Sequence, residues 1–341
     1  MNDHPSIYER YSRQMLFKPI GSQGQANLAE SRVLIVGLGA LGSVLANHMV
    51  RAGVGFVHIV DRDYVEYSNL QRQMLYDEED AKQAYPKAIA AEKKLRNINS
   101  NVRIEAIVTD VTPLNVESLL EGINLVLDGT DNFQTRLLLN DACFKAEIPF
   151  VYGGAVSSQG MAAMFIPSLT CCLRCLIGAG EGGAGTCDTI GVISPIVDIV
   201  ASLQAVEALK YLVHDEEHRN KSLLTIDVWH NQWLDMLLPG PRQDCPTCGT
   251  NQYPSLQPSA DDTTALCGRE TIQIYRSQSF NLSVWADRLS ASCQLFANPF
   301  LLKAQLPEGE TIVLFPDGRA LVQGTEDLVR ARTLFDKYIG T

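Results

Sequence analysis

A glycine-rich turn near the start of the chain constrains its fold more than any other feature of the sequence. The turn, Gly37-Leu38-Gly39-Ala40-Leu41-Gly42, follows the apolar run 33–36, and apolar residues continue with helical spacing from 38 to 51. Glycines here allow a tight turn and let backbone N–H groups approach a phosphate at the helix N-terminus. Asp61 ends the next apolar run, 19 residues after Gly42, where a carboxylate can accept hydrogen bonds from ribose hydroxyls. Together these residues predict a nucleotide-binding unit.

Apolar runs and helical stretches alternate over the first 250 residues. The runs suited to buried strands are 33–36, 56–60, 102–108, 125–127, 150–152 and 223–228. Helical spacing is found at 38–51, 86–97, 132–146 and 190–213. This alternation predicts an α/β fold, in which helices cover both faces of a Rossmann-like, doubly wound and mostly parallel sheet.

The composition of the chain changes after residue 250, where Pro, Ser and Asp gather between 250 and 264. We therefore expect a nucleotide-binding domain at 1–250, a linker at 251–265 and a small α+β module at 266–341. In the module the pattern predicts a strand, a helix, three strands and a helix, at 271–275, 282–289, 300–304, 311–315, 320–323 and 326–338.

Composition and charge exclude several classes of protein. Apolar residues make up 46% of the 341 residues and charged residues 20%, the mix of a folded globular protein. The 28 Lys and Arg against 39 Asp and Glu give a net charge of −11, which argues against broad contact with nucleic acid or an anionic membrane. The first residues lack the basic and apolar regions of a signal peptide, and no apolar run reaches about 18 residues. We therefore expect a cytoplasmic protein without nucleic acid or membrane partners.

Polar side chains after Asp61 favour a triphosphate over a dinucleotide. Ser68-Asn69-Leu70-Gln71-Arg72-Gln73 supplies amide and guanidinium groups, and Lys87 adds a second cation at the start of a helix. A dinucleotide has only a pyrophosphate to neutralise, whereas a triphosphate needs more positive charge and a metal. Taken singly, Arg72 or Lys87 could instead form a surface ion pair.

Asp131 lies in Asp128-Gly129-Thr130-Asp131-Asn132, directly after an apolar strand. The carboxyl ends of parallel strands are the usual ligand-binding edge of an open sheet, and a carboxylate there suits Mg²⁺ that bridges phosphate oxygens. The alternative interpretation makes Asp131 the N-cap of the next helix. Because the glycine turn, Asp61, the two cations and Asp131 occur together in this order, the sequence favours a triphosphate site.

Four of the nine cysteines form two pairs, and in each pair two residues separate the cysteines. Cys172-Leu173-Arg174-Cys175 and Cys245-Pro246-Thr247-Cys248 offer four thiolates, the ligand set of a structural, tetrahedral Zn²⁺. Alternatively, either CxxC segment could be a redox-active cysteine pair, although the sequence around neither segment resembles thioredoxin. Apolar patterns place Cys143, Cys267 and Cys293 in the core, and we expect the same of Trp229 and Trp233.

Cys187 follows the glycine-rich segment 178–186, a composition suited to a mobile loop that crosses an active site. A thiol on such a loop could act as a nucleophile or carry sulfur, and the alternative is an inert loop thiol.

As an ordered set, these residues resemble the ThiF/MoeB adenylyltransferases, relatives of the ubiquitin-activating enzymes. The resemblance covers residues 8–249 and rests on Tyr11-Ser12-Arg13-Gln14, the glycine turn, Asp61, Asn69-Leu70-Gln71-Arg72-Gln73, Lys87, Thr130-Asp131-Asn132 and the two cysteine pairs. The module at 266–341 resembles the extension that some bacterial members carry.

The resemblance implies ATP as substrate and assigns the residues that would bind it. Asp61 would hold the ribose, Arg72 and Lys87 the phosphates, and Asp131 the Mg²⁺. The other pocket residues would be Gly37, Gly39, Ala40, Gly42, Ser68, Asn69, Leu70, Gln71 and Asn132. Arg13 would reach across a homodimer to the phosphates bound by the second copy. The chain departs from the family in Ala40, where Gly is frequent, and in a slightly longer segment before Lys87.

The resemblance also implies a reaction, the adenylation of the C-terminal glycine carboxylate of a small ubiquitin-like sulfur carrier that ends in diglycine. Pyrophosphate would be released, and the product would serve thiamine thiazole or molybdopterin biosynthesis, with a cysteine desulfurase or another protein as sulfur donor. The catalytic residues would be Arg13, Arg72, Lys87, Asp131 and Cys187.

Two alternatives from other classes stay open. An NAD(P)- or FAD-dependent oxidoreductase would use the same glycine turn and Asp61, but Arg72, Lys87 and Asp131 would then be unexplained. A non-catalytic scaffold for ubiquitin-like proteins would keep the fold and the zinc, but it would not need these charged residues.

Overall fold

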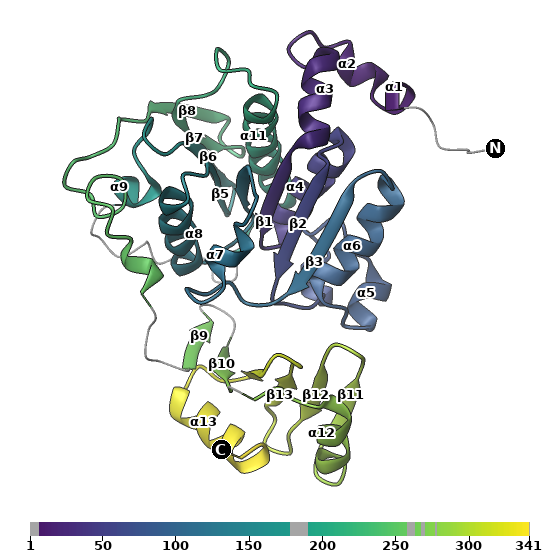
Figure 1. Ribbon diagram of the computed structural model, residues 1–341. Coiled ribbons are helices and arrows are strands. Elements are labelled where there is room, and N and C mark those ends of the chain that lie inside the picture. The colour runs from purple at the N-terminus through teal and green to yellow at the C-terminus, as the bar shows by residue number, and fades with distance from the viewer. Residues whose placement is uncertain (1–6, 178–189, 258–262, 267–269, 277, 341) are drawn as a thin grey trace. The chain divides into compact units, whose positions relative to one another are not determined.

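The computed structural model describes residues 7–177, 190–257, 263–266, 270–276 and 278–340. The chain forms two compact units, Met1–Pro258 and Ser259–Thr341, which Figure 1 shows as a larger and a smaller body. The division falls inside the segment 251–265 expected to be a linker. Part of that segment has regular structure, because η2 (Pro254–Leu256) belongs to the first unit and β9 (Thr263–Leu266) to the sheet of the second.

An eight-stranded sheet forms the centre of the first unit, in the order β3-β2-β1-β4-β5-β6-β7-β8. The parallel part consists of β1 (Arg32–Val36), β2 (Phe56–Asp61), β3 (Arg103–Val108), β4 (Leu125–Asp128) and β5 (Phe150–Val156). The antiparallel part consists of β6 (Gln159–Phe165), β7 (Ser222–Asp227) and β8 (Gln232–Leu237). The doubly wound, mostly parallel sheet that the sequence predicts is therefore confirmed.

The strand order reverses at β1, because β2 and β3 lie on one side of it and β4 and β5 on the other. Val36, the last residue of β1, is level with Val60 of β2 and with Asp128 of β4. The carboxyl ends of these three strands therefore meet at the switch point, where open α/β sheets bind their ligands.

Helices cover both faces of the sheet, each above its own hydrophobic core (Figure 1). One face carries α3 (Gly21–Glu30), α4 (Ala40–Ala52), α6 (Lys87–Ile98) and α11 (Ser194–Leu212). The other carries α7 (Val116–Leu119), α8 (Phe133–Lys145) and α9 (Leu173–Ile177). Shorter helices are α1 (Ile7–Arg10), α2 (Ser12–Met15), η1 (Tyr67–Asn69) and α5 (Glu78–Lys82). No helix among the described residues is both long enough and apolar enough to span a bilayer.

In this unit the sequence pattern did not predict strands β6 and β8. β6 is rich in Gly and Ala, which have weak strand propensity, but α11 packs so closely on it that a Cβ at Gly160 would lie 2.3 Å from Val200 Cγ2. β8 is the edge strand, and all six of its residues are exposed. Trp229 and Trp233 are 73% and 59% exposed, so the expectation that they lie in the core is wrong.

The second unit is an antiparallel sheet with two helices, in the strand order β11-β12-β13-β14-β10-β9. Its further strands are β10 (Thr271–Tyr275), β11 (Gln294–Ala297), β12 (Leu302–Gln305), β13 (Thr311–Leu314) and β14 (Arg319–Gln323). The helices α12 (Leu282–Leu289) and α13 (Leu328–Tyr338) contribute to its core. Cys293 packs partly buried against this core, and Cys143 is buried in the first unit, whereas Cys267 lies outside the described residues.

Candidate functional site

The glycine turn joins β1 to α4 at the switch point, and close backbone packing requires two of its glycines. Gly37 has a φ of 82°, and a Cβ there would lie 2.8 Å from the carbonyl oxygen of Gly129. A Cβ at Gly42 would lie 1.8 Å from the carbonyl oxygen of Gly37. At Gly39 the nearest atom would be 3.8 Å away, on Gln73. The fold therefore needs Gly37 and Gly42, whereas Gly39 leaves room beside the N-terminus of α4.

Ala40 opens α4 and packs against the hydrophobic core. Because its methyl group faces the core, this departure from the family's glycine is compatible with a phosphate in front of the helix. The first N–H groups of a helix have no intrahelical partner, and together with the helix dipole they favour an anion at that position.

Asp61 connects the end of β2 to the glycine turn. Its Oδ2 accepts a hydrogen bond from the backbone N–H of Leu38 at 2.5 Å, and its Oδ1 accepts one from the N–H of Asp63 at 2.6 Å. Burial raises the pKa of the Asp61 carboxyl, and the charge of Lys87 opposes that shift. A carboxylate offers about four lone-pair directions, so Asp61 can also accept hydrogen bonds from ribose hydroxyls.

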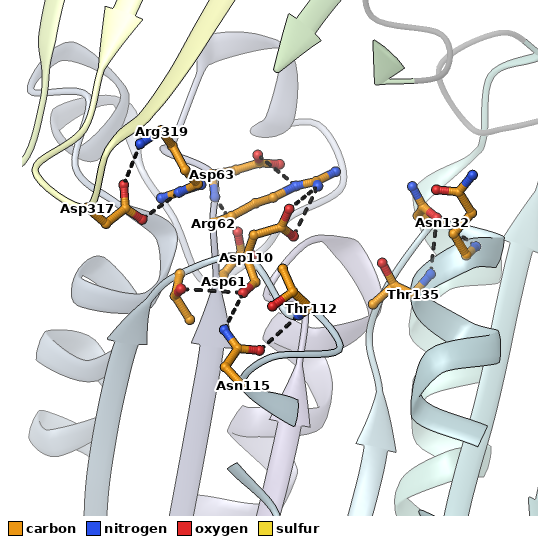
Figure 2. Close-up of polar contacts among 12 residues, drawn as sticks. Asp61, Arg62, Asp63, Asp110, Thr112, Asn115, Asn132, Thr135, Asp317 and Arg319 are labelled. Carbon is orange, nitrogen blue, oxygen red and sulfur yellow. Dashed lines mark hydrogen bonds and ion pairs between the residues drawn. The ribbon is translucent and has the colours of Figure 1, made fainter. Parts of the chain in front are cut away.

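A bridge between the ends of β2 and β3 lies beside Asp61, as Figure 2 shows. Arg62 Nη1 lies 3.1 Å from both carboxylate oxygens of Asp110. Asn115 donates a hydrogen bond to the carbonyl oxygen of Asp110 and accepts one from the N–H of Thr112, both at 2.8 Å. The loop after β3 is thereby attached to the same edge of the sheet as Asp61. Sequence reasoning missed this bridge, because 48 positions separate its partners.

Lys87 is held at the same edge by Asp63. Its side chain is 3% exposed, its Nζ lies 3.3 Å from Asp63 Oδ2, and its backbone N–H donates to the carbonyl oxygen of Asp63 at 2.9 Å. A nearly buried ammonium group is costly unless an anion accompanies it, and Asp63 supplies that anion. Asp63 was not among the residues predicted from the sequence, although its position two residues after Asp61, at a strand end, was a usable signal.

The segment 68–73 divides into structural and accessible residues. Asn69 is buried and its Oδ1 accepts the N–H of Glu66, so its amide caps η1. Leu70 packs against the core. Ser68 and Gln71 are exposed, and the guanidinium group of Arg72 donates to the carbonyl oxygen of Ser68 at 3.0 Å. The structure therefore gives Asn69 and Leu70 roles in the fold, whereas Ser68, Gln71 and Arg72 present polar groups at the surface.

Asp131 follows β4 and is exposed, directly before α8. The N-cap of α8 is its neighbour Asn132, whose Oδ1 accepts the N–H groups of Gln134 at 2.8 Å and Thr135 at 3.2 Å (Figure 2). The interpretation of Asp131 as the N-cap is therefore wrong. The Oδ1 atom of Asn132 is engaged by its own helix, so this oxygen is not available to a nucleotide.

A buried ion pair supports the corner that carries Asp131. Asp128 accepts hydrogen bonds from Thr130 and lies 3.2 Å from Arg136 Nε. The same guanidinium group donates to the carbonyl oxygens of Thr130 at 2.6 Å and Gly153 at 3.0 Å. Burial raises the pKa of Asp128, and the charge of Arg136 opposes that shift. Sequence reasoning missed Arg136, which links the end of β4 to Gly153 within β5.

Arg13 lies far from the glycine turn of its own chain. Its neighbour Gln14 donates to the carbonyl oxygen of Ala52, the last residue of α4, whereas the turn precedes the first residue of that helix. The 13 residues of α4 extend over about 20 Å. The structure therefore brings the turn, Asp61, Lys87 and Asp131 to one edge of the sheet and places Arg13, which is exposed, at the opposite end of α4.

The two CxxC segments meet. The Sγ atoms of Cys172, Cys175, Cys245 and Cys248 all lie within 4.8 Å of one another, with separations of 3.8 Å for 172–175, 3.6 Å for 172–245 and 3.4 Å for 175–248. A tetrahedral zinc site with bonds of about 2.3 Å has sulfur separations of about 3.8 Å. The four thiols therefore fit a structural zinc ion, with no coordination position left for substrate.

Burial affects the chemistry of these thiols. It raises the pKa of Cys172 and raises the pKa of Cys175 to about 12. Without a cation, the thiols of Cys172 and Cys175 keep their protons at neutral pH, and metal binding must release these protons. Cys187, the other cysteine with a predicted role, lies outside the described residues.

Fold and site together define the class of protein. A doubly wound sheet presents a glycine turn, the buried carboxylate of Asp61, the ammonium group of Lys87 and the exposed carboxylate of Asp131 at its switch point, and a four-cysteine cluster lies elsewhere in the same unit. The sequence matches the ThiF family over residues 11–247, and the chain belongs to that family.

Known proteins with similar sequences extend this assignment. A sulfur carrier protein ThiS adenylyltransferase of Bacillus subtilis is 46% identical over 336 residues, which cover 97% of this chain and 99% of that protein. A molybdopterin-synthase adenylyltransferase of Salmonella typhimurium is 36% identical over 244 residues, or 70% of this chain and 96% of that protein. The fold is similar to that of Escherichia coli MccB in a crystal structure with ATP, with a TM-score of 0.62 and 20% identity over 73% of this chain and 75% of that one.

Proposed function

We propose that this chain is an adenylyltransferase that activates the C-terminal glycine carboxylate of a small ubiquitin-like sulfur carrier protein. The observation that carries the proposal is the similarity to a ThiS adenylyltransferase over nearly the whole length of both chains. The gathering of the glycine turn, Asp61, Lys87 and Asp131 at the switch point supports it, because these groups suit the ribose and phosphates of ATP.

In the proposed reaction, a carboxylate oxygen of the carrier attacks the α-phosphorus of ATP. A new oxygen–phosphorus bond forms, the bond to the bridging oxygen of the β-phosphate breaks, and pyrophosphate leaves with that electron pair. The product is an acyl adenylate, in which AMP is a leaving group that a sulfur nucleophile can displace. No general base is needed, because the carboxylate is already ionised at neutral pH.

The proposed catalytic residues act by positioning and by neutralising charge. Asp61 orients the ribose, the turn at Gly39 and Ala40 cradles phosphate with its N–H groups, and Arg72 and Lys87 balance the phosphate charge. Asp131 would hold a Mg²⁺ ion, which supplies further neutralisation of the phosphates. Because Asp63 holds Lys87 beside the phosphate-binding edge, the lysine is in place before ATP arrives.

The carrier is proposed to be of the ThiS type, so that the product serves the formation of the thiamine thiazole. The ThiS-directed relative matches 97% of this chain and therefore includes the second unit, whereas the molybdopterin-synthase relative matches 70%. A carrier of the MoaD type is the second candidate, supported by the 36% identity to that relative.

The active form is proposed to be a cytoplasmic homodimer. The separation of Arg13 from the turn of its own chain supports a role in the site of the second copy. Cys187 is proposed to receive sulfur or acyl groups after adenylation, and a cysteine desulfurase or another protein would supply the sulfur.

Mass spectrometry of the carrier tests the proposal. A ThiS-type carrier that ends in diglycine, incubated with ATP, Mg²⁺ and this protein, should gain the mass of an adenylyl group, AMP less one water, at its C-terminus. A carrier that lacks the two glycines should gain nothing, and an unmodified intact carrier together with binding of NAD in preference to ATP would favour the oxidoreductase alternative.

A further inference from the structure

Asp141 in α8 is a buried carboxylate with four hydrogen-bond donors. Its Oδ1 accepts from Thr247 Oγ1 at 2.5 Å and from Asn140 Nδ2 at 3.1 Å. Its Oδ2 accepts from Arg174 Nη2 at 2.7 Å and from the backbone N–H of Ser255 at 2.8 Å. The side chain is fully buried, and a carboxylate so satisfied is fixed in position.

Two of the four donors to Asp141 come from the two cysteine segments. Arg174 is the third residue of Cys172-Leu173-Arg174-Cys175, and Thr247 is the third residue of Cys245-Pro246-Thr247-Cys248. Arg174 Nε also donates to Thr247 Oγ1 at 3.1 Å, so the two segments are bonded to each other as well as to one carboxylate. The adjacent residue of α8 completes the attachment, because Asn140 Oδ1 accepts the N–H of Leu173 at 2.8 Å.

Charge alone does not explain an aspartate at this place. Four thiolates around one Zn²⁺ leave two net negative charges, so a further carboxylate nearby opposes zinc binding by simple Coulomb repulsion. Residues outside the coordination shell commonly orient the ligands, and their loss typically costs 10–100-fold in metal affinity. The two roles of Asp141, as a charge and as a holder of ligands, thus predict effects of opposite sign on zinc affinity.

We propose that Asp141 is the shared outer carboxylate of the zinc site, a positioning residue that holds both cysteine segments at the spacing of the tetrahedron. The sulfur separations of 3.4–3.8 Å are already close to those of a zinc–thiolate tetrahedron. The hydrogen bonds of Asp141 connect the two segments, which are 73 residues apart in the chain, at this spacing.

Zinc affinity, measured by competition with a chromophoric chelator on the full-length protein, tests the role of Asp141. The Asp141→Asn variant keeps the shape of the side chain but replaces one accepting carboxylate oxygen with an NH₂ group, which faces hydrogen-bond donors. Zinc should therefore bind about 10–100-fold more weakly. The matched control is Asp244→Asn, which removes the same charge next to Cys245 from a side chain that is 73% exposed and paired with Arg242. Its zinc affinity should stay within about twofold of the wild type.

A second pair of variants keeps the test decisive if Asp141→Asn fails to fold. Thr247→Val removes the hydroxyl that donates to Asp141, whereas Thr247→Ser keeps it. We expect about tenfold weaker zinc binding for the valine variant and affinity near the wild type for the serine variant. Cobalt substituted at the site should show weakened tetrahedral thiolate spectra only in Asp141→Asn and Thr247→Val.

Three results would overturn the proposal. The first is zinc affinity in Asp141→Asn that is unchanged or tighter, since that is the sign a simple charge predicts. The second is equal affinity in Thr247→Val and Thr247→Ser. The third concerns the melting temperature of Asp141→Asn. If it falls below that of the wild type by the same amount with zinc and with excess chelator, and zinc affinity is unchanged, Asp141 stabilises only the fold.

Discussion

The Nζ atom of Lys87 lies 3.3 Å from Oδ2 of Asp63, and both residues border the edge of the sheet where Asp61 ends β2. The lysine opens α6 and the aspartate belongs to the loop after β2, so the pair fixes the helix against the strand end. A cation held in this way is available to phosphate without a search through side-chain conformations, which lowers the entropic cost of binding.

The Lys87→Met variant should lose about 100-fold or more in ATP–pyrophosphate exchange, because one preorganised charged donor is removed from the phosphate site. Lys94→Met is the matched control. It removes a lysine of the same helix whose ammonium lies 2.6 Å from Asp80. If exchange activity falls equally in both variants, the loss results from a disturbed helix α6 and not from a missing charge at the phosphates.

The Asp131→Ala variant should abolish exchange and leave thermal stability unchanged, because its side chain is exposed and the N-cap of α8 is provided by Asn132. The adjacent Asn132→Ala variant should behave in the reverse way. It should retain exchange while unfolding becomes easier by about 0.5–2 kcal/mol, the usual loss for an N-cap. Exchange and chemical denaturation measured on both variants give the comparison, and near-normal exchange in Asp131→Ala would refute the role of this carboxylate.

Mixing Arg13→Ala chains with Asp131→Ala chains should regenerate exchange activity. The reason is that Arg13 lies at the far end of α4 from its own turn, so in a mixed dimer one of the two sites would contain both intact residues. The measurement needs heterodimers purified with two different tags. Exchange no higher than that of the two parent variants in such heterodimers would contradict action across the dimer.

Elemental analysis should find about one zinc per chain, and its removal should destabilise the first unit. Free metal at about 1,000 times the Kd adds about 4 kcal/mol, which corresponds to roughly 8–16 °C in the melting temperature of a unit of this size. Burial raises the pKa of Cys175 to about 12, so its proton must leave when zinc binds. Apparent zinc affinity should therefore rise with pH between about 6 and 9, and a pH-independent affinity or a stable metal-free protein would refute the site.

The sequence predicts those parts of the site that have a local signature, and it misses those that depend on the fold. Gly37, Gly42 and Asp61 follow from a strand–turn–helix pattern whose residues are close in the chain. The contacts that support the site join residues that are distant in the sequence. Arg136 contacts Gly153, 17 positions away, and Arg62 contacts Asp110, 48 positions away. Only the sheet order brings such partners together.

Local propensity fails for related reasons in the strands and in the core. β6 contains Gly160, Ala162 and Ala163, and α11 needs a close approach at Gly160, so tertiary packing overrides strand propensity there. Trp229 and Trp233 resemble core residues by type, but they lie at the edge of the sheet, where β8 has no neighbour among the described strands on its outer side.

Carrier-dependent ATP–pyrophosphate exchange tests the central claim most directly, because it reports reversible formation of an acyl adenylate without any sulfur donor. With a ThiS-type carrier that ends in diglycine, the protein should exchange labelled pyrophosphate into ATP, and exchange should vanish when the two glycines are removed. Exchange that is absent with both ThiS-type and MoaD-type carriers, in protein shown to bind ATP, would contradict the assigned reaction.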